Sequence, residues 1–289
     1  MRLVTFSDGG GSSRAKRVGL LDGADVIDLA DGALPADMLR LLEAGPSALD
    51  AARSAATRAP RHTLEQVSLE APIARPPKVL AVGLNYADHV AETGRDTPTI
   101  PILFNKQSTA ANGPFGEIVR PRVSPALDYE GEFGVVIGKR CRHVPREHAH
   151  EVIAGYTVVN DVSVRDWQVR SPTMTMGKSF DTHCPFGPAI VTPDELPDPH
   201  DCDLRTYVNG ELRQQSNTRE LIFDCFDLIE HVSTAFTLEP GDLISTGTCG
   251  GVAAAMKPPK WLVPGDVVRV EIEGLGAIEN TVVDEAEDA

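Results

Sequence analysis

LDYEGEFGVVIG, residues 127–138, is the most informative segment of this 289-residue chain. Its apolar second half is typical of a strand buried on both faces, so we expect one strand over Leu127–Ile137. Side chains two residues apart on a strand point to the same face. Glu130 and Glu132 are therefore expected to enter the core together, and Asp128 is a further candidate for that face.

Adjacent carboxylates inside a core need a compensating charge, because they repel each other and lose hydration. Asp161 follows the apolar run Tyr156–Val159 and offers a third carboxylate at the end of another buried strand. Oxygen ligands favour hard cations, Mg²⁺, Mn²⁺ or Ca²⁺, over Zn²⁺. The three carboxylates thus predict a catalytic metal site with positions open for substrate oxygens. For Glu130 and Glu132 alone, the wet face of an edge strand is an equally good explanation.

The segment Asn85–Thr93 predicts a short helix that carries a histidine and a glutamate three residues apart. At this spacing His89 and Glu92 share a helix face. The carboxylate can then orient the imidazole as a general base. Such spacing often arises by chance, and a solvated surface helix is the simpler interpretation of this motif alone.

Two further segments can supply groups for binding anions. Pro172 stands where a phosphate-binding loop ending at Gly177–Ser179 would need glycine, so that loop is rejected. Lys178 can instead stabilise an oxyanion, although an exposed lysine is the simpler interpretation. Thr246–Thr248 follows the predicted strand Leu243–Ser245, and we expect a turn there whose hydroxyl and N–H groups can hold a carboxylate. A tight turn explains its glycine equally well.

The composition describes an acidic globular chain. Asp and Glu number 42 against 27 Lys and Arg, which gives a net charge of −15. Nucleic-acid coating and membrane-surface binding both need positive fields, so we expect neither nucleic-acid nor membrane partners. An anionic substrate would need local positive charge from its site. Five scattered cysteines and the lack of an apolar N-terminal segment predict a cytoplasmic protein with reduced thiols.

The chain is expected to form a small N-terminal α/β domain over residues 1–70 and a larger domain over 71–289. Strand-like runs precede residues 35–58, where apolar residues recur at helical spacing. Prolines between residues 72 and 77 then favour extended structure and end helices. The boundary is therefore placed near residue 70.

The larger domain is predicted to be mainly β. Val79–Val82 predicts a buried strand, and Asn209-Gly210 predicts a type I′ hairpin. Val267–Glu273 alternates apolar and charged residues, as a half-buried strand does. Asp224–Phe236 is a clear helix with a capping aspartate. The fold class is thus α+β, mostly β, with a β-rich roll or sandwich.

In combination, these segments resemble the fumarylacetoacetate hydrolase family, and the resemblance covers about residues 78–283. It implies that family's mixed β-sandwich roll behind a small N-terminal domain, and a homodimer. The segments that carry it, in order, are Gly83–Tyr86 with His89 and Glu92, Asp128–Glu132, Gly134–Gly138, Asn160–Ser163 with Arg165 and Asp166, Gly177–Asp181, Val208–Glu211 and Thr246–Thr248.

The resemblance also implies a single site that holds one Mg²⁺ or Mn²⁺ per subunit. The histidine and its glutamate would lie on a lid-like segment over the substrate. The lysine would stabilise developing charge, and the threonine would hold a substrate carboxylate. The implied residues are the metal ligands Glu130, Glu132 and Asp161, the catalytic residues His89, Glu92 and Lys178, and the substrate contacts Arg165, Gln168 and Thr248.

The activity that the resemblance implies is metal-dependent hydrolysis of a C–C bond in a β-diketo acid. The substrate would be a small anionic acylpyruvate, such as fumarylpyruvate or acetylpyruvate, and the products pyruvate or a related 2-keto acid plus a carboxylic acid. Decarboxylation of oxaloacetate or a related β-keto acid is the main alternative, since the same ligands would serve it. A hydrolase or dehydratase of keto-deoxy sugar acids is another.

A catalytically silent metal-binding or ligand-sensing protein is the alternative from a different class. His89, Glu92 and Lys178 argue against it, because a binding scaffold needs only the metal ligands. Substrate identity depends on two departures from the family pattern. Cys249 stands where the family usually has proline, and Met256–Leu262 lengthens the loop that follows.

Overall fold

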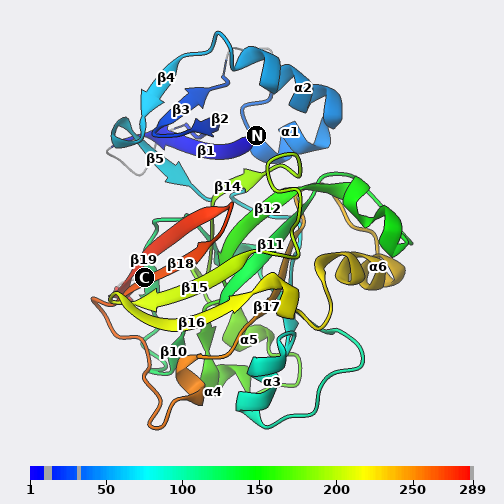
Figure 1. Cartoon of the computed structure of the whole chain (residues 1–289). Helices are drawn as coiled ribbons and strands as arrows, with labels where there is room; N and C mark the ends of the chain where they lie inside the picture. The colour runs from blue at the N-terminus through cyan, green and yellow to red at the C-terminus, as the bar shows by residue number, and fades with distance from the viewer. Residues whose placement is uncertain (10–14, 31–33, 287–289) are drawn as a thin grey trace.

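The computed structural model describes residues 1–9, 15–30 and 34–286. Its class is α+β and mostly β, as predicted. Figure 1 shows a small upper part above a larger part, in which a long sheet is faced by a second, smaller sheet. Among the described residues, no helix is both long and apolar enough to span a membrane.

Four strands form the middle of the long sheet, and every residue in them is buried. In spatial order they are β14 (Cys184–Val191), β12 (Ile153–Asn160), β11 (Gly131–Ile137) and β17 (Leu243–Thr248). Beyond β17 the sheet continues through β6 (Val79–Gly83) and β7 (Ile102–Lys106). Both faces of the sheet are covered, which explains why these strands have nearly continuous apolar sequences.

The N-terminal part adds strands to the other end of the same sheet. Its elements are β1 (Arg2–Asp8), β2 (Arg17–Asp22), β3 (Asp25–Asp28), α1 (Met38–Glu43), α2 (Pro46–Ala55), β4 (Arg61–Thr63), η1 (Leu64–Gln66) and β5 (Val67–Glu70). Strand β1 pairs with β2 and β5, and its first residues also pair with β14. The predicted strands and helices of this part are confirmed, and the domain boundary near residue 70 stays a prediction.

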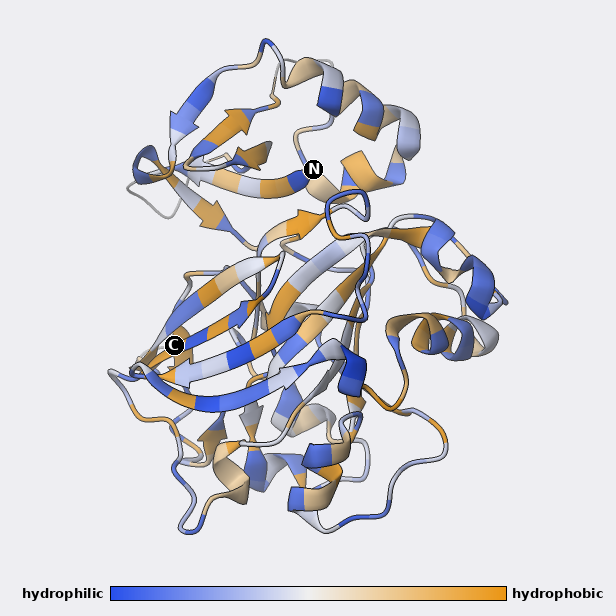
Figure 2. Cartoon of the chain, in the orientation of Figure 1, coloured by the Kyte–Doolittle hydropathy of each residue, from blue (hydrophilic) through white to orange (hydrophobic). Residues whose placement is uncertain are grey.

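The smaller sheet packs its apolar face against the long sheet. Its order is β16 (Glu211–Asn217), β15 (Asp203–Val208), β18 (Val267–Ile272), β19 (Gly276–Asp284) and β9 (Ile118–Arg120). Figure 2 shows orange and blue residues alternating along its strands. Asn209 and Gly210 both have positive φ, 52° and 77°, so the predicted type I′ hairpin is confirmed.

The helices outside the N-terminal part lie at the side and at the lower end of the long sheet (Figure 1). On the side, α6 (Cys225–Ala235) packs beside η3 (Arg146–Val152), and Asp224 caps α6 as predicted. The remaining elements, most of them short and near the lower end, are α3 (Ala87–Thr93), η2 (Ser108–Ala110), β8 (Ala111–Asn112), β10 (Leu127–Asp128), β13 (Ser163–Val164), α4 (Arg165–Gln168), α5 (Thr175–Lys178), η4 (Thr218–Glu220) and η5 (Ala253–Ala255).

The prediction of one continuous strand over Leu127–Ile137 was wrong. Strand β10 pairs with β13, whereas β11 pairs with β12 and β17, and Tyr129 and Glu130 lie between them. Side chains interrupt the ladder here, because the N–H of Tyr129 donates to the Asp128 carboxylate and that of Glu130 donates to Asn160 Oδ1. The break turns Asp128 away from the two glutamates.

The turn predicted at Thr246–Thr248 was also wrong, because these residues belong to β17. The pairing register shifts beside them, with Glu132 opposite Thr248 and Gly134 opposite Ser245. Gly247 adopts φ 105° within this bulge. The bulge aims the N–H of Gly247 at the side chain of Glu132, so the glycine serves the site without a turn.

Candidate active site

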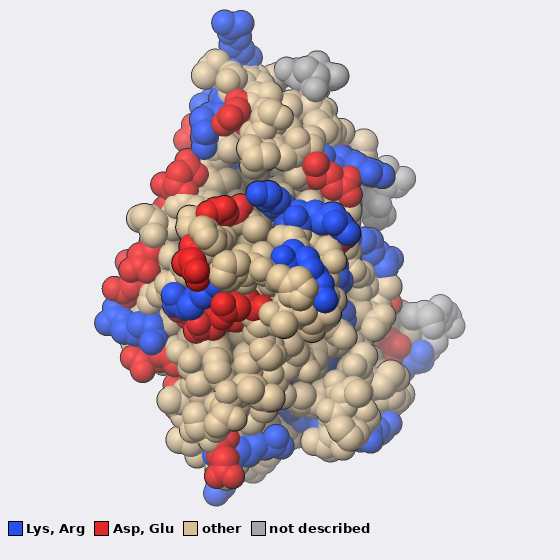
Figure 3. Space-filling view, turned by 90° about the vertical axis from the view of Figure 1, so that its right-hand side faces the viewer, with Lys and Arg blue, Asp and Glu red and all other residues tan. Residues whose placement is uncertain are grey.

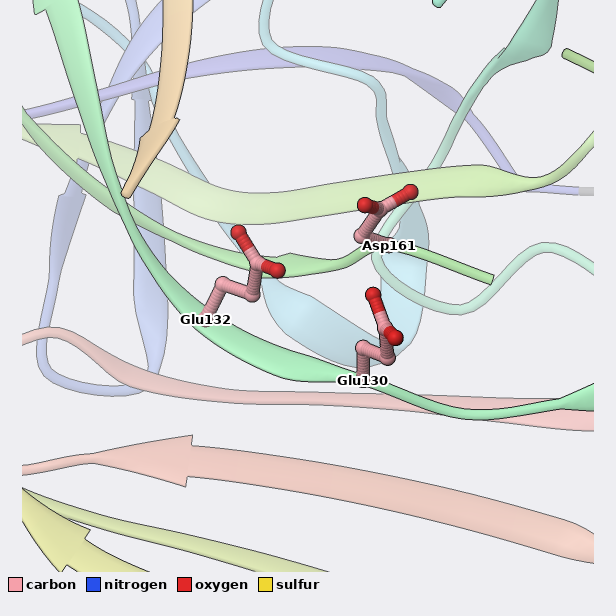
Figure 4. Close-up of side chains that lie close together, drawn as sticks. All are labelled: Glu130, Glu132 and Asp161. Carbon is pink, nitrogen blue, oxygen red and sulfur yellow. The ribbon is translucent and has the colours of Figure 1, made fainter. Parts of the chain in front are cut away.

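Three buried carboxylates converge where β11 and β12 approach the lower end of the long sheet. Glu130, Glu132 and Asp161 each offer an oxygen, and these oxygens lie within 4.8 Å of one another. Figure 4 shows the three side chains pointing toward a common point. The N–H of Asp161 donates to the Glu130 carbonyl at 2.8 Å, which joins the two segments. We call these three residues the carboxylate cluster.

Three cations contact the carboxylate cluster or its surroundings. Lys178 Nζ donates to Glu130 and, at 2.8 Å, to Asp161. Lys106 Nζ donates to the other Asp161 oxygen at 2.5 Å, and Arg165 contacts Glu130 at 2.7 Å. Burial opposes ionisation of Glu130, yet Arg165 and Lys178 together hold the pKa of that carboxyl well below its usual range.

Glu132 lacks such a partner, since no lysine or arginine in the described part of the chain forms an ion pair with it. Its carboxylate accepts hydrogen bonds from Ser245 Oγ at 2.6 Å and from the N–H of Gly247 at 2.8 Å. Burial raises the pKa of Glu132 well above its usual range, and the neighbouring Asp161 and Glu130 raise it further. This carboxylate therefore needs a further cation to be ionised in place.

A divalent cation fits the donor set of the carboxylate cluster. With Asp128 included, four buried carboxylates face the three cations Lys106, Lys178 and Arg165, so one negative charge is uncompensated. The ligand atoms that the cluster offers are carboxylate oxygens, as hard divalent cations prefer. The residues predicted as metal ligands are thus brought together in a form that suits such an ion.

Helix α3 carries the predicted histidine and glutamate to the same place. His89 Nδ1 and Glu92 Oε1 are 2.7 Å apart, and Glu92 Oε2 accepts the N–H of Gly251 at 2.9 Å. Since a carboxylate accepts, Nδ1 carries the proton and Nε2 is available to another acid or base. The pairing predicted for His89 and Glu92 is confirmed as geometry, and its catalytic role stays a prediction.

One cavity of about 860 Å³ joins these groups. Asp161 does not line it and lies behind Lys178. Part of the wall is apolar, with Val82, Ile102 and Phe104 from β6 and β7. The predicted residues that line the cavity are His89, Glu92, Glu130, Glu132, Arg165, Gln168, Lys178 and Thr248.

The predicted substrate contacts already have partners within the chain. Arg165 Nη1 donates to Gln168 Oε1 at 3.0 Å. Thr248 Oγ1 donates to the Gly131 carbonyl at 2.9 Å and accepts from Gln214 Nε2 at 2.8 Å. Arg165 Nη2 is buried without a hydrogen-bond partner in the described structure. The substrate-binding roles of these three side chains stay predictions.

The glycine before Lys178 has a packing role. A Cβ atom on Gly177 would lie 2.2 Å from the backbone nitrogen of Gln168. Glycine at this position lets α5 approach α4 closely, and it places Lys178 in contact with Glu130 and Asp161. The Gly177–Ser179 motif therefore reflects contact between two short helices, which agrees with the rejection of a phosphate loop.

Sequence reasoning missed Lys106 and misplaced Asp128. Lys106 is buried at the end of β7, where a lysine closing an apolar strand was the available signal. Asp128 accepts from Arg165 Nε at 2.8 Å and from the N–H groups of Ala253 and Ala254 at 2.8 and 3.0 Å. Its role is to hold Arg165 and the loop after β17, because the break in the strand turns it there.

Gln214 of β16 was also missed. Its Oε1 accepts the N–H of Gly131, and its Nε2 donates to Thr248 Oγ1 and to the Cys249 carbonyl. One side chain thus ties the smaller sheet to both strands of the site. A buried glutamine on an otherwise polar strand gives no local signal in the sequence, so this contact could not be predicted.

The surface away from the cavity carries charges of both signs. Figure 3 shows lysines and arginines interspersed with aspartates and glutamates over the upper half of the face in view, and a mainly uncharged lower region. Many exposed arginines pair with acidic neighbours, such as Arg61 with Asp22 and Arg219 with Asp201. The net charge of −15 is thus not gathered into one acidic patch on this face.

Comparison with known proteins supports the family resemblance. Residues 78–283 match the family model described as Fumarylacetoacetate (FAA) hydrolase C-terminal. The chain is 46% identical over 289 residues to "Oxaloacetate tautomerase Fahd2a, mitochondrial" of Rattus norvegicus, which covers 98% of this chain and 92% of the relative. Because that relative is named as mitochondrial, the cytoplasmic location expected for this chain stays a prediction.

Solved structures of two hydrolases have the same fold as this chain over nearly its whole length. Fumarylacetoacetate hydrolase from psychrophilic Exiguobacterium antarcticum has a TM-score of 0.87 and 38% identity, covering 99% of this chain and 100% of that chain. Maleylpyruvate hydrolase from Sphingobium sp. SYK-6, in complex with manganese(II) ion and pyruvate, has a TM-score of 0.82 and 34% identity with the same coverage. The fold prediction is confirmed, and the chain belongs to the fumarylacetoacetate hydrolase family.

Proposed function

We propose that this protein is a divalent-metal-dependent enzyme that interconverts the keto and enol forms of oxaloacetate or a closely related 2-keto acid. The observation that carries the proposal is the shared cavity, in which the His89–Glu92 pair and Lys178 accompany Glu130 and Glu132 of the carboxylate cluster. The oxaloacetate tautomerase of Rattus norvegicus, 46% identical, supports the choice of substrate.

Glu130, Glu132 and Asp161 would hold Mg²⁺ or Mn²⁺. When bound, such an ion supplies a Lewis acid that draws electrons from the substrate's 2-keto group and acidifies the protons on the adjacent carbon. Lys178 adds a buried positive charge beside Glu130 and Asp161. This charge favours the negative oxygen that develops when a proton leaves carbon.

His89 is the group that moves the proton. Its Nε2 accepts the proton from C3 of the substrate, the C–H electron pair forms the C2=C3 double bond, and the ketone oxygen takes the negative charge. Returning the proton to that oxygen completes the enol. Glu92 holds the Nδ1 proton at 2.7 Å and stabilises the imidazolium formed between the two transfers.

Hydrolysis of an acylpyruvate, the activity that the sequence resemblance implies, is the second candidate. The same His89–Glu92 pair could deprotonate a water for attack on the distal carbonyl, and the likeness to maleylpyruvate hydrolase favours this reaction. Decarboxylation of oxaloacetate breaks a C–C bond without a proton acceptor, so the pair does not favour it. The sugar-acid alternative rests on the longer loop alone.

Chelator-treated protein, assayed with and without restored Mg²⁺, separates these activities. With oxaloacetate we expect metal-dependent exchange between the keto and enol forms, without release of pyruvate. The ultraviolet absorbance of the enol measures this exchange. Pyruvate and CO₂ from oxaloacetate would replace the proposal with decarboxylation. Pyruvate and a carboxylic acid from acetylpyruvate, with no tautomerisation, would replace it with hydrolysis. We also propose a homodimer, which light scattering of the same preparation tests.

A further inference from the structure

Three basic side chains line the same cavity as the catalytic groups. Arg95 follows the C-terminal end of α3, Arg170 follows α4, and Lys257 belongs to the loop after β17. All three residues are exposed, in contrast to the buried Lys178. We call Arg95, Arg170 and Lys257 the cationic rim, because they are the solvent-exposed basic residues of the cavity lining.

The cationic rim is poorly neutralised by the protein. Within the described residues, Arg95 and Lys257 take part in no ion pair. Arg170 lies 4.0 Å from Asp166, a long contact between two exposed groups, and its guanidinium stacks over the Trp167 ring at 3.9 Å. Exposed arginines elsewhere on this acidic chain commonly have carboxylate partners at about 3 Å, such as Arg61 with Asp22 at 2.8 Å.

Acidic residues of the cavity lining do not neutralise the rim either. They are Glu92, Glu130 and Glu132. Glu92 is held by His89 and the N–H of Gly251, while the other two belong to the buried carboxylate cluster. Positive charge is thus left over on exposed residues of the cavity lining, whereas the catalytic groups of the same lining are mostly buried.

A dianionic substrate would need this arrangement. The net charge of −15 repels anions at long range, so a site for a dianion must supply positive charge locally. The reacting 2-keto acid group of the substrate belongs beside the carboxylate cluster and Lys178. A second carboxylate at the far end of the molecule would then point outward, toward Arg95, Arg170 and Lys257. The cavity volume, about 860 Å³, leaves room for this length.

We propose that the cationic rim binds the distal carboxylate of the substrate and selects 2-keto dicarboxylic acids over 2-keto monocarboxylic acids. This inference rests on the proposed function for the position of the reacting group. It adds a specificity that the carboxylate cluster cannot provide, since that cluster contacts only the end common to both kinds of acid.

A matched pair of keto acids tests the rim by binding alone. 2-Oxoglutarate and 2-oxopentanoate have the same chain length and differ in the distal carboxylate. Titration calorimetry on the full-length, Mg²⁺-loaded protein is expected to show about tenfold tighter binding of 2-oxoglutarate. A difference of this size corresponds to the affinity that two to three exposed ion pairs contribute. The preference should shrink as salt is added, because exposed charges are screened.

The variants then identify the residues. Arg95→Gln combined with Lys257→Gln should reduce the preference to about twofold and leave the affinity for 2-oxopentanoate unchanged, and Arg170→Gln should reduce it less. Lys260→Gln is the matched control, since Lys260 is an exposed lysine of the same loop that does not line the cavity and lies 3.8 Å from Glu211. It should keep the full preference.

Equal binding of the two keto acids by the unaltered protein would overturn the inference, and so would a preference that survives the double substitution or a failure of both acids to bind. Turnover of oxaloacetate is measured separately. If the unaltered protein prefers 2-oxoglutarate but does not tautomerise oxaloacetate, the proposed function alone is refuted. Tautomerisation without any preference would refute the cationic rim alone.

Discussion

The carboxylate cluster and the cationic rim belong to the same site, and they differ in how their charges are balanced. In the cluster, Glu130 and Asp161 are buried and each contacts a cation at hydrogen-bond distance. At the rim, Arg95 and Lys257 are exposed and have no ion-pair partner in the described structure. Except at Glu132, the buried charges of the cluster are balanced within the protein, whereas the exposed charges of the rim are left for a ligand. Changes in the cluster should therefore alter folding and chemistry, and changes at the rim should alter binding alone.

The largest effect is expected from Asp161→Asn. Asp161 accepts from both Lys106 and Lys178, so loss of its charge leaves two buried ammonium groups undercompensated. The free energy of unfolding should fall by about 3 to 5 kcal/mol, and Mn²⁺ binding should be lost. Urea unfolding and titration calorimetry measure the two. Glu147→Gln, at an exposed position, is the control. A loss in the Asp161 variant as small as that of the control would contradict the balance described for the cluster.

His89→Ala should act on chemistry and leave folding intact. Because His89 is the proton carrier of the proposed reaction, turnover should fall by roughly 10² to 10⁴-fold. Metal affinity should not change, since His89 contacts Glu92 and none of the three carboxylates. Kinetics at saturating Mg²⁺, together with calorimetric titration of the metal, check both statements. Unchanged turnover would remove His89 from the mechanism.

His183 is a buried titratable residue outside the carboxylate cluster, and it allows the cost of charging a buried group to be measured. Burial, together with a smaller contribution from the nearby Lys106, lowers the pKa of its imidazole to about 3. Below an unfolded-state pKa of about 6.5, the unfolded chain binds a proton that the folded chain does not. The free energy of unfolding should therefore be largest above that pH, and His183 should reduce it by about 1.4 kcal/mol per pH unit as the pH falls toward 3.

His183→Gln isolates this contribution, because glutamine keeps a donor for the Val119 carbonyl that Nε2 contacts at 2.8 Å. Urea unfolding at pH 7, 6 and 5 should show a shallower loss of stability for the variant than for the unaltered protein. Parallel curves for the two proteins would mean that His183 accepts its proton in the folded state.

The smallest effect on folding is expected from Glu132→Gln, which sharpens the comparison within the cluster itself. Glu132 contacts Ser245 and Gly247 and has no cation partner in the described structure, so a neutral side chain keeps its hydrogen bonds. In chelator, the free energy of unfolding should change by less than about 1 kcal/mol or increase. The stabilisation by Mg²⁺ should disappear. A large loss of stability in chelator would show that Glu132 is balanced by the protein after all.

The parts of the fold that the sequence predicted are those set by local pattern. The apolar run of β11, the Asn209-Gly210 turn and the Asp224 cap each act over a few residues. The three metal-ligand candidates could be found because buried strands that end in carboxylates are rare without a cation. The prediction of one strand across Tyr129 and Glu130 was wrong, because their N–H groups donate to the side chains of Asp128 and Asn160 instead of to a neighbouring strand.

The parts that could not be predicted depend on contacts between distant segments. Lys106 reaches Asp161 across 55 positions of sequence, and Gln214 reaches Thr248 across 34. The position of Lys106 at the end of an apolar strand, and that of Gln214 on a polar strand, do not indicate which distant residue each side chain contacts. Local spacing could therefore place the acids of the site and could not find the lysine and the amide that hold them.

The pairing of β1 with β14 has a consequence unrelated to catalysis. The unpaired edge of a sheet is a template on which another chain can add a strand, and long apolar edges promote aggregation. β14 is buried along its whole length and apolar, and Arg2 and Leu3 of β1 cover its end at Val191 and Ile190. The N-terminal strands thus cover this edge of the long sheet. The outermost of them, β4, is a three-residue strand with a charged arginine, so it has few backbone groups with which another chain could pair.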